Sequence, residues 1–307
     1  MPAVAVEIVE CHRDFVVAFK EAGIHSAPLR PEDGECALAL VAEQFPEVLA
    51  VQGRKVVEGG LVHRIDQDTA GLLLIARNQG FYDHIMACQE EGLFKKGYTA
   101  RCQYLPSCPE LLGGFPPPPN LLGFHGTLST GFIVESGFRP YGPGRKQVRP
   151  VTQDSGKFSR RKAGRGGRNP SKTGEGDLEL QSYTTSFHLI ESSGTQGSFQ
   201  HKPTNDASNH LGAAITELET LTVKATITKG YRHQVRCHLA WCGLPIVADP
   251  LYHPLEKTAP QMQFFATGLT FPLMEAQETA PLGTLPKASQ SSKLFSMDIS
   301  SRILSSL

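Results

Sequence analysis

Hydrophobic and polar residues follow one another in short blocks that predict more strands than helices. A continuous apolar run at 71–77 is typical of a strand that is buried on both faces. Apolar residues recur with helical spacing at 35–45, 79–94 and 233–242, and Gly243 is expected to end the last of these helices. Runs rich in β-branched residues predict further strands at 4–9, 15–19, 98–105, 178–190, 218–228 and 264–271. Because strands outnumber helices and their order is mixed, the pattern favours an α+β fold.

Four stretches depart from this pattern and suggest how the chain is organised. Residues 106–127 are rich in proline and glycine, which predicts a loop or a stiff connection. We expect one domain at 1–286, interrupted by a basic Gly/Arg-rich insertion at 142–176 and a polar insertion at 192–212. Residues 287–307 contain eight serines, so we predict a mobile tail there.

The overall composition is that of a globular protein. Of the 307 residues, 40% are hydrophobic and 20% are charged, which permits a buried core and excludes a wholly disordered chain. No apolar run approaches the roughly 20 residues that a membrane-spanning helix needs, and the first residues lack the features of a secretory signal. Seven cysteines, an odd number without a CxxC pair, indicate reduced thiols. We therefore expect a cytoplasmic protein without a membrane partner.

A net charge of zero conceals a strong local asymmetry. Residues 139–176 hold eleven Lys or Arg against two acids, a local charge of +9, which leaves −9 on the remainder. A dense cationic segment on an acidic protein suggests a polyanionic partner, because it can displace the counterions of a phosphate backbone. A solvated, disordered insertion that is kept soluble by its charge is the alternative that composition leaves open.

The first cluster of candidate chemistry lies just before the apolar run. His63, Arg64 and Asp66 fall in a turn that leads into the buried strand, where polar side chains are held rigidly and still reach solvent. An ordinary charged turn has the same pattern. His63 and Asp66 could form half of a metal site, but no third ligand follows at a recognisable spacing. His233 and His238 are five residues apart and fall on different faces of a helix, so we expect no metal.

Two further clusters lie near the predicted strand at 98–105 and helix at 233–242. Arg232 and Arg236 are four residues apart, which predicts one shared helix face with His233 beside it. Such a face can pair with a carboxylate or bind phosphate, although a solvated basic face would look the same. Tyr98 begins a strand, a position at which tyrosine more often packs than reacts.

Taken together and in this order, three segments resemble the RluA-type RNA pseudouridine synthases. That family carries H-R-L-D-x-x-T-S-G-L-L-L, then K-x-Y-x-A, then G-R-x-H-Q-I-R-x-H-L followed by G-x-P-I-x-G-D-x-x-Y. The corresponding segments here are HRIDQDTAGLLL at 63–74, KGYTA at 96–100 and GYRHQVRCHLAWCGLPIVADPLY at 230–252. Weaker similarity at 17–28 and 264–272 extends the resemblance over most of the expected domain.

Departures from the family pattern are few. Ile65 replaces Leu, Ala70 replaces Ser, Ala248 replaces Gly, and Tyr231-Arg232 stands where the family more often has Arg-x. None of these removes the aspartate, the tyrosine or the later arginine of the motifs. Because similarity begins almost at the first residue, we expect a catalytic domain without a preceding RNA-binding module. The basic insertion then becomes a candidate for anchoring RNA.

The resemblance implies a fold and an activity. The expected fold is a mixed, mainly antiparallel sheet with flanking helices around a central cleft. The expected reaction is the isomerisation of specific uridines in ribosomal or transfer RNA to pseudouridine, without cofactor or metal. Asp66 would act as nucleophile or base, Arg236 would be its cation, and Tyr98 would stack on the target base. Arg64 would brace the gap left when the target nucleotide is flipped out of its helix.

The resemblance also suggests how RNA is held. The expected RNA-binding residues are Arg64 together with His63, Arg232, His233 and Gln234, and the protein is expected to be a monomer. Two alternatives remain at this stage. One is a non-catalytic RNA-binding protein that retains the synthase fold, and the other is a glycosidase that uses Asp66 with Asp68. Asp68 is too close in sequence to Asp66 to be a good partner for glycoside hydrolysis.

Overall fold

In the part of the chain that the structure describes, ten strands form one sheet, and only one pair of neighbouring strands is parallel. The computed structural model describes residues 5–28, 30, 34–119, 131–152, 181–193, 220–255, 261–274 and 293–305. The strand order is β1-β2-β3-β9-β4-β8-β7-β5-β6, with β10 added to β9. The strands are β1 (Val6–Cys11), β2 (Phe15–Lys20), β3 (Ala70–Ala76), β4 (Lys95–Gln103), β5 (Phe132–Tyr141), β6 (Gln147–Val151), β7 (Tyr183–Ser193), β8 (Thr220–Ile227), β9 (Phe264–Pro272) and β10 (Leu294–Asp298). Since only β3 and β9 run parallel, the predicted α+β fold with a mixed, mainly antiparallel sheet is confirmed.

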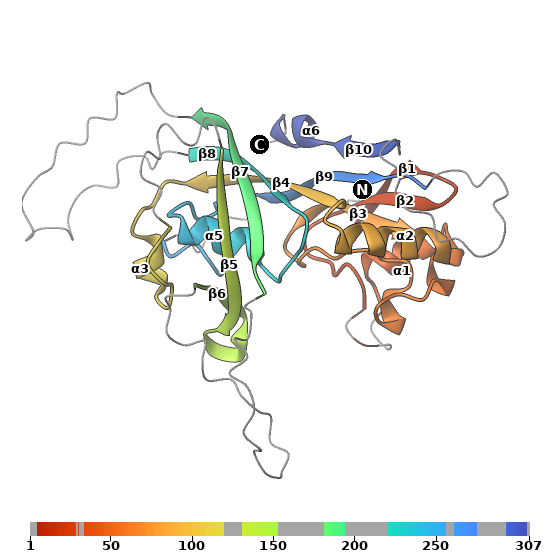
Figure 1. Cartoon of the computed structure of the whole chain (residues 1–307), viewed down its shortest axis with the longest axis horizontal. Coiled ribbons are helices and arrows are strands. Elements are labelled where there is room, and N and C mark those ends of the chain that lie inside the picture. The colour runs from red at the N-terminus through yellow and green to blue at the C-terminus, as the bar shows by residue number, and fades with distance from the viewer. Residues whose placement is uncertain are drawn as a thin grey trace, which may run out of the picture.

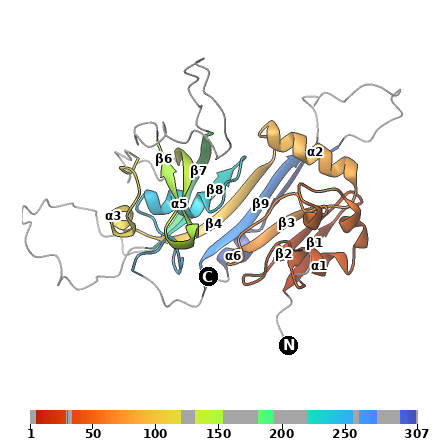
Figure 2. The ribbon, with the colours of Figure 1, turned by 90° about the horizontal axis from the view of Figure 1, so that it is seen from below.

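The helices are short and flank the sheet. The α-helices are α1 (Ala37–Ala42), α2 (Gln79–Glu90), α3 (Cys108–Leu112), α5 (Gln234–Trp241) and α6 (Ser300–Leu304), and single 3₁₀ turns are η1 (Pro46–Ala50), η2 (Val56–Glu58) and η3 (Pro143–Arg145). Figure 1 and Figure 2 show β4 and β9 running between two halves, one with β1–β3, α1 and α2, the other with β5–β8, α3 and α5. Within the described ranges, no helix is long and apolar enough to cross a membrane.

Strand β3 is the centre of the core because both of its faces are buried. Leu73 and Ile75 pack on the face that also receives α1 and α5, whereas Leu72 and Leu74 pack against α2. This confirms the prediction made from the continuous apolar run. The predicted helix at 79–94 is also confirmed in part as α2, which begins where the Asn78 side chain accepts the backbone N–H of Phe81.

The C-terminal segment corrects the prediction of a mobile tail at 287–307. Within it, β10 pairs antiparallel with β9, from Leu294 opposite Pro272 to Asp298 opposite Gly268, and α6 follows. Phe295 stacks on Phe271 with 4.9 Å between ring centroids. Strand β10 lies along β9 in Figure 1. The serine content suggested mobility, but the alternating Phe295 and Met297 supply the apolar face that a strand needs.

The basic insertion predicted at 142–176 begins later than expected. Residues 142–151 belong to a hairpin in which β6 pairs with β5, and Arg149 within it is only 1% exposed. The Arg149 guanidinium lies 4.2 Å from the ring centre of Tyr141 and 4.3 Å from that of Phe115, and it donates to the carbonyl of Gly113. This arginine is therefore a packing residue rather than a surface cation. Residues 153–176, and 194–212 of the polar insertion, lie outside the described part of the chain.

The junction of β3 and β9 depends on a glycine. Gly71 has a φ of +136°, and a Cβ atom there would collide with the backbone of Ala266 in β9. We predict that Gly71→Ala lowers the free energy of unfolding by about 1–3 kcal/mol, measured by urea denaturation.

Gly80 in α2 provides the matched control for this substitution. A Cβ atom at Gly80 would make only an ordinary 3.6 Å contact with the Asn78 side chain. We expect Gly80→Ala to leave stability unchanged or raise it by up to about 1 kcal/mol. Equal stabilities for the two variants would show that the β3–β9 junction tolerates a side chain.

Candidate active site

The three segments singled out in the sequence meet around one cavity. Its volume is about 740 Å³, within the usual range for small-molecule sites, and it is lined by the turn before β3, by β4, and by the residues that begin α5. All eight residues expected at the site line it: His63, Arg64, Asp66, Tyr98, Arg232, His233, Gln234 and Arg236. The expected cleft is therefore present, and its geometry shows what each side chain can do.

The turn that carries Asp66 is fixed by hydrogen bonds on both sides. The Ser26 hydroxyl donates to the carbonyl of Ile65 at 2.9 Å and accepts its backbone N–H at 3.2 Å. The fully buried Lys20 ammonium donates to the carbonyls of Gln67 (3.1 Å) and Ile24 (2.9 Å), among others. Burial lowers the pKa of Lys20 to about 8, although Asp66 and Asp68 act in the opposite direction. The ammonium is thus largely charged at pH 7 and holds the turn in place.

Asp66 forms an ion pair with a buried arginine that is itself anchored from behind. Arg236 donates from Nη1 to Oδ2 of Asp66 at 2.9 Å, and from Nε and Nη2 to the two oxygens of Asp249, each at 2.8 Å. Asp249 also accepts the backbone N–H groups of Leu251 and Tyr252. Burial alone would lower the pKa of Arg236, but the two carboxylates outweigh it and raise that pKa. The guanidinium is therefore permanently charged and held in one position.

The Asp66 carboxylate remains open to the cavity. Its side chain is 29% exposed, whereas that of Asp249 is fully buried. The guanidinium thus separates a structural carboxylate from one that can meet a ligand. His233 approaches the same carboxylate oxygen as Arg236, with 3.7 Å between its Nε2 and Oδ2 of Asp66, and its Nδ1 is 3.2 Å from the hydroxyl of Tyr252. Burial lowers the pKa of His233, and Asp66 only partly offsets this, which favours a neutral ring at pH 7.

Arg232 does not share a helix face with Arg236, so that prediction is wrong. Helix α5 begins only at Gln234, after His233, which has a left-handed φ of +57°. Arg232 therefore lies before the helix, and its Nη2 donates to the carbonyls of Arg145 (2.6 Å) and Gln147 (3.3 Å) in the β5–β6 hairpin. It is an exposed cation at the rim of the cavity.

Gln234 is a structural residue at the start of α5. It is buried, its Oε1 accepts the backbone N–H of Tyr231 at 2.9 Å, and its Nε2 donates to the carbonyl of Thr184 at 3.0 Å. These bonds fix the turn that presents Arg232 and His233. Gln234 thus acts on the site through its neighbours.

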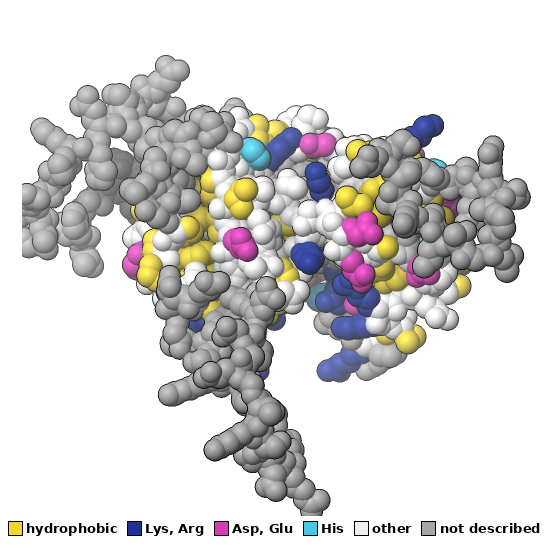
Figure 3. All heavy atoms as spheres, in the orientation of Figure 1, with side chains coloured by type: hydrophobic (Ala, Val, Ile, Leu, Met, Phe, Trp, Pro, Cys, Tyr) yellow, Lys and Arg dark blue, Asp and Glu magenta, His cyan; other side chains and the backbone are white. Residues whose placement is uncertain are grey.

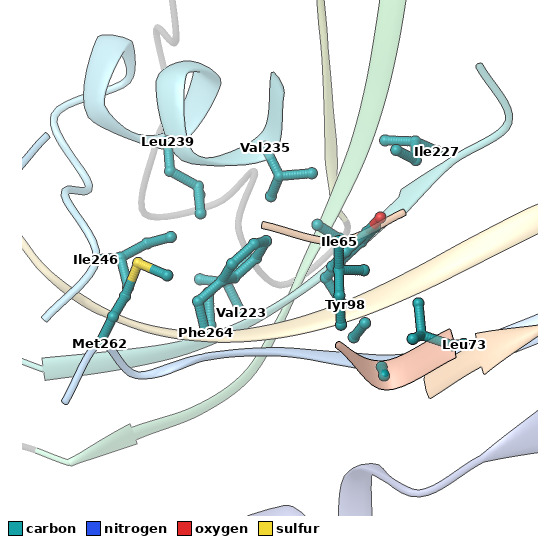
Figure 4. Close-up of a cluster of buried hydrophobic side chains, with 14 of the residues drawn as sticks. Ile65, Leu73, Tyr98, Val223, Ile227, Val235, Leu239, Ile246, Met262 and Phe264 are labelled. Carbon is teal, nitrogen blue, oxygen red and sulfur yellow. The ribbon is translucent and has the colours of Figure 1, made fainter. Parts of the chain in front are cut away.

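Tyr98 lies on the apolar floor of the cavity. Its ring is stacked on that of Phe264, with centroids 5.2 Å apart, and Ile65 and Val235 belong to the same cluster (Figure 4). Burial, together with the negative charge of Asp66, raises the pKa of the Tyr98 phenol. The phenol is therefore neutral at physiological pH, and an aromatic ring beside a carboxylate is suited to hold a planar base.

Arg64 and His63 are adjacent in sequence but differ in role. Arg64 is exposed at the rim, where its Nη1 lies 3.1 Å from Oε1 of Glu58. The Nε2 atom of His63 accepts the backbone N–H of Leu74 at 3.2 Å, and the ring packs edge-on against Phe94. Burial, followed by the charge of a neighbouring lysine, lowers the pKa of His63 to about 3, so the ring is neutral.

Two anchoring residues were not predicted from the sequence. Asp249 stands in the third segment but is 13 residues from Arg236, and Lys20 is separated from the Asp66 turn by more than 40 residues. Only the fold brings these groups together. Across the described residues, no group of three or more His, Cys, Asp or Glu side chains is arranged to hold a metal ion.

Comparison with known proteins identifies a family pattern in the sequence. The sequence pattern of the RNA pseudouridylate synthase family matches residues 14–241, which include Asp66, Tyr98 and Arg236. A curated protein of Chloroflexus aurantiacus described as an uncharacterized RNA pseudouridine synthase is 27% identical over 232 residues, 75% of this chain. The chain spans about half (49%) of the length of that relative.

A solved structure shows the same fold. Human RNA pseudouridylate synthase domain-containing protein 1 aligns with a TM-score of 0.54 and 16% identity, over 99% of this chain and 96% of that one. At this identity the likeness concerns the fold alone. The family pattern, by contrast, covers most of the sequence, including the first two segments and the part of the third segment that lines the cavity. The chain belongs to the RNA pseudouridylate synthase family.

Proposed function

We propose that this protein is an RNA pseudouridine synthase that isomerises uridines in structured RNA, either ribosomal or transfer RNA. The observation that carries the proposal is the Asp66 carboxylate, which is open to the cavity while its Oδ2 is bound by the buried Arg236. A carboxylate beside a fixed cation, next to an aromatic floor, can act on a sugar whose base is stacked nearby.

The proposed reaction exchanges one glycosidic bond for another. The bond between uracil N1 and ribose C1′ breaks, the uracil rotates, and C5 bonds to C1′. The C5 proton then leaves and N1 takes up a proton, so product and substrate have the same composition. Asp66 acts on the ribose as nucleophile or base, and the neutral ring of Tyr98 holds the uracil during its rotation. The target nucleotide must be flipped out of its helix, because the glycosidic bond is inaccessible in a stack.

The charge around the cavity supports an RNA substrate. Six Lys or Arg side chains line it, against two carboxylates, Glu58 and Asp66, each of which is already paired with an arginine. Lys and Arg side chains gather beside the hollow between the two halves of the molecule in Figure 3. The six cations are Arg54, Lys55, Arg64, Lys96, Arg232 and Arg236. Such a surplus of cations attracts phosphates and steers RNA toward the site.

We predict that Asp66→Asn abolishes turnover and leaves RNA binding intact. The substitution keeps the shape of the side chain and removes the charge that the reaction needs. Turnover is measured as tritium released to water from ribosomal and transfer transcripts labelled at uracil C5. Binding is measured as the fraction of the same transcripts that the protein retains. The control is Asp68→Asn, an exposed position outside the cavity lining. It should retain activity within about twofold.

Two results would contradict this assignment. Tritium release by Asp66→Asn at the rate of the unaltered protein would remove Asp66 from the reaction. Binding without any release by the unaltered protein, over the whole pool of transcripts, would favour an RNA-binding protein that retains the fold without the activity.

We also predict that the basic segment contributes to RNA affinity through charge. Deleting 153–176 removes seven Lys or Arg and two acids but leaves β6 intact. We expect weaker RNA binding and a shallower dependence of log Kd on log salt, by about 0.7–0.9 for each phosphate that the segment neutralises. The control is deletion of 195–212, which removes one lysine, one aspartate and no net charge. If both deletions leave the salt dependence unchanged, the basic segment does not contact RNA.

A further inference from the structure

One lysine of the cavity lining has no partner that accounts for its position. Lys96 lies two residues before Tyr98 on β4, so both side chains project from the same face of the sheet. Lys96 is only 6% exposed and lines the cavity. Its Nζ lies 5.3 Å from the ring centre of Phe94, and no acceptor among the described residues is within hydrogen-bonding distance of it. Because Lys96 Nζ is not among the sealed polar atoms, the ammonium of this largely buried side chain is open to the cavity, where a ligand can reach it.

The groups around Lys96 are also hydrogen-bond donors. A backbone N–H can only donate, so the Leu74 N–H requires His63 Nε2 to be the acceptor, which places the ring proton on Nδ1. That Nδ1 is buried, and no partner for it exists in the described structure. Arg54 lines the same part of the cavity, and its Nη2 donates to Oε1 of Gln89. The His63 N–H is thus enclosed by protein, whereas Lys96 and Arg54 are two cations that line the cavity.

No carboxylate of the cavity is available to neutralise this region. Asp66 is bound to Arg236, and Glu58 to Arg64. Burial, and to a smaller extent the charge of Arg54, lowers the pKa of Lys96 to about 8, so the amine is still largely protonated at pH 7. Since Lys96 and Arg54 are both cations and the carboxylates of the lining are already paired with arginines, the ligand that fits is an anion.

We propose that Lys96, together with Arg54, forms a subsite for a phosphate of the RNA backbone next to the uridine that stacks on Tyr98. The inference rests on the proposed function. It is favoured over a uracil carbonyl because a neutral oxygen does not balance the charge of a buried ammonium.

Lys96→Met tests the subsite, with Lys95→Met as the matched control. Methionine keeps the length of the side chain and removes its charge, and Lys95 is the exposed neighbour on the opposite face of β4. We expect Lys96→Met to weaken RNA binding about tenfold or more at low salt and to reduce the slope of log Kd against log salt by about 0.7–0.9. Lys95→Met should change the affinity by no more than about twofold. Equal losses in the two variants would overturn the proposal.

Stability separates a ligand-binding lysine from a structural one. Because Lys96 gives up no hydrogen bond or ion pair, we expect the melting temperature of Lys96→Met to equal or exceed that of the unaltered protein. A marked fall in melting temperature with unchanged RNA affinity in the folded fraction would assign the lysine to folding. Lys96→Arg, which keeps charge and donors, should restore most of the RNA affinity and the salt slope. Failure of this rescue would also count against a phosphate contact.

Inorganic phosphate distinguishes failure of the subsite from failure of the proposed function. We expect the ³¹P resonance of phosphate to broaden on titration into the unaltered protein and into Asp66→Asn, and to remain sharp with Lys96→Met. This binding requires neither RNA nor turnover. Broadening without tritium release would retain the subsite and reject the enzyme, whereas release with equal broadening by Lys96→Met would retain the enzyme and reject the subsite.

Discussion

The guanidinium of Arg236 connects the two halves of the candidate site, and the arrangement around it depends on how that charge is buried. Transfer of an arginine out of water is favourable only where good geometry and further hydrogen bonds compensate its lost hydration. Asp249 provides this with a bidentate contact, and the backbone N–H groups after Asp249 complete its own shell. The Nη1 group of Arg236 then donates to Asp66, which comes from the other half of the molecule.

The sheet determines where Asp66 can stand. Strand β3 is buried on both faces and meets β9 in a short parallel contact at Ala70 and Gly71, so the turn just before it emerges at a fixed place between the halves. Lys20 and Ser26 tie that turn to the neighbouring loop through backbone carbonyls, independently of the side chain that the turn presents. The carboxylate is thus positioned by the backbone and oriented by Arg236. Because the carboxylate is already in position, the site does not have to rearrange when a substrate binds.

Local sequence patterns predicted the strands and helices that pack on apolar neighbours. They failed where a contact with a residue distant in sequence determines the local structure. The run at 71–77 and the stripe of Phe81, Ile85 and Cys88 correspond directly to β3 and α2. Arg232 was placed on a helix because spacing does not reveal that His233 adopts a left-handed conformation just before α5. Strands β6 and β10 were missed because basic or serine-rich composition hid residues that pack on aromatic rings. The Asp66–Arg236 pair was expected from the family resemblance, whereas Asp249 and Lys20 required the fold.

Asp249 holds the guanidinium of Arg236 in the position from which it donates to Asp66. The most direct test is the single-turnover rate of Asp249→Asn on C5-labelled RNA, measured with the Kd for the same RNA and a melting curve. We predict a folded variant whose RNA affinity is nearly unchanged and whose single-turnover rate is lower by about 100-fold. The rate falls because a small displacement of the guanidinium releases the Asp66 carboxylate from its position. An unchanged rate in a folded Asp249→Asn variant would contradict it.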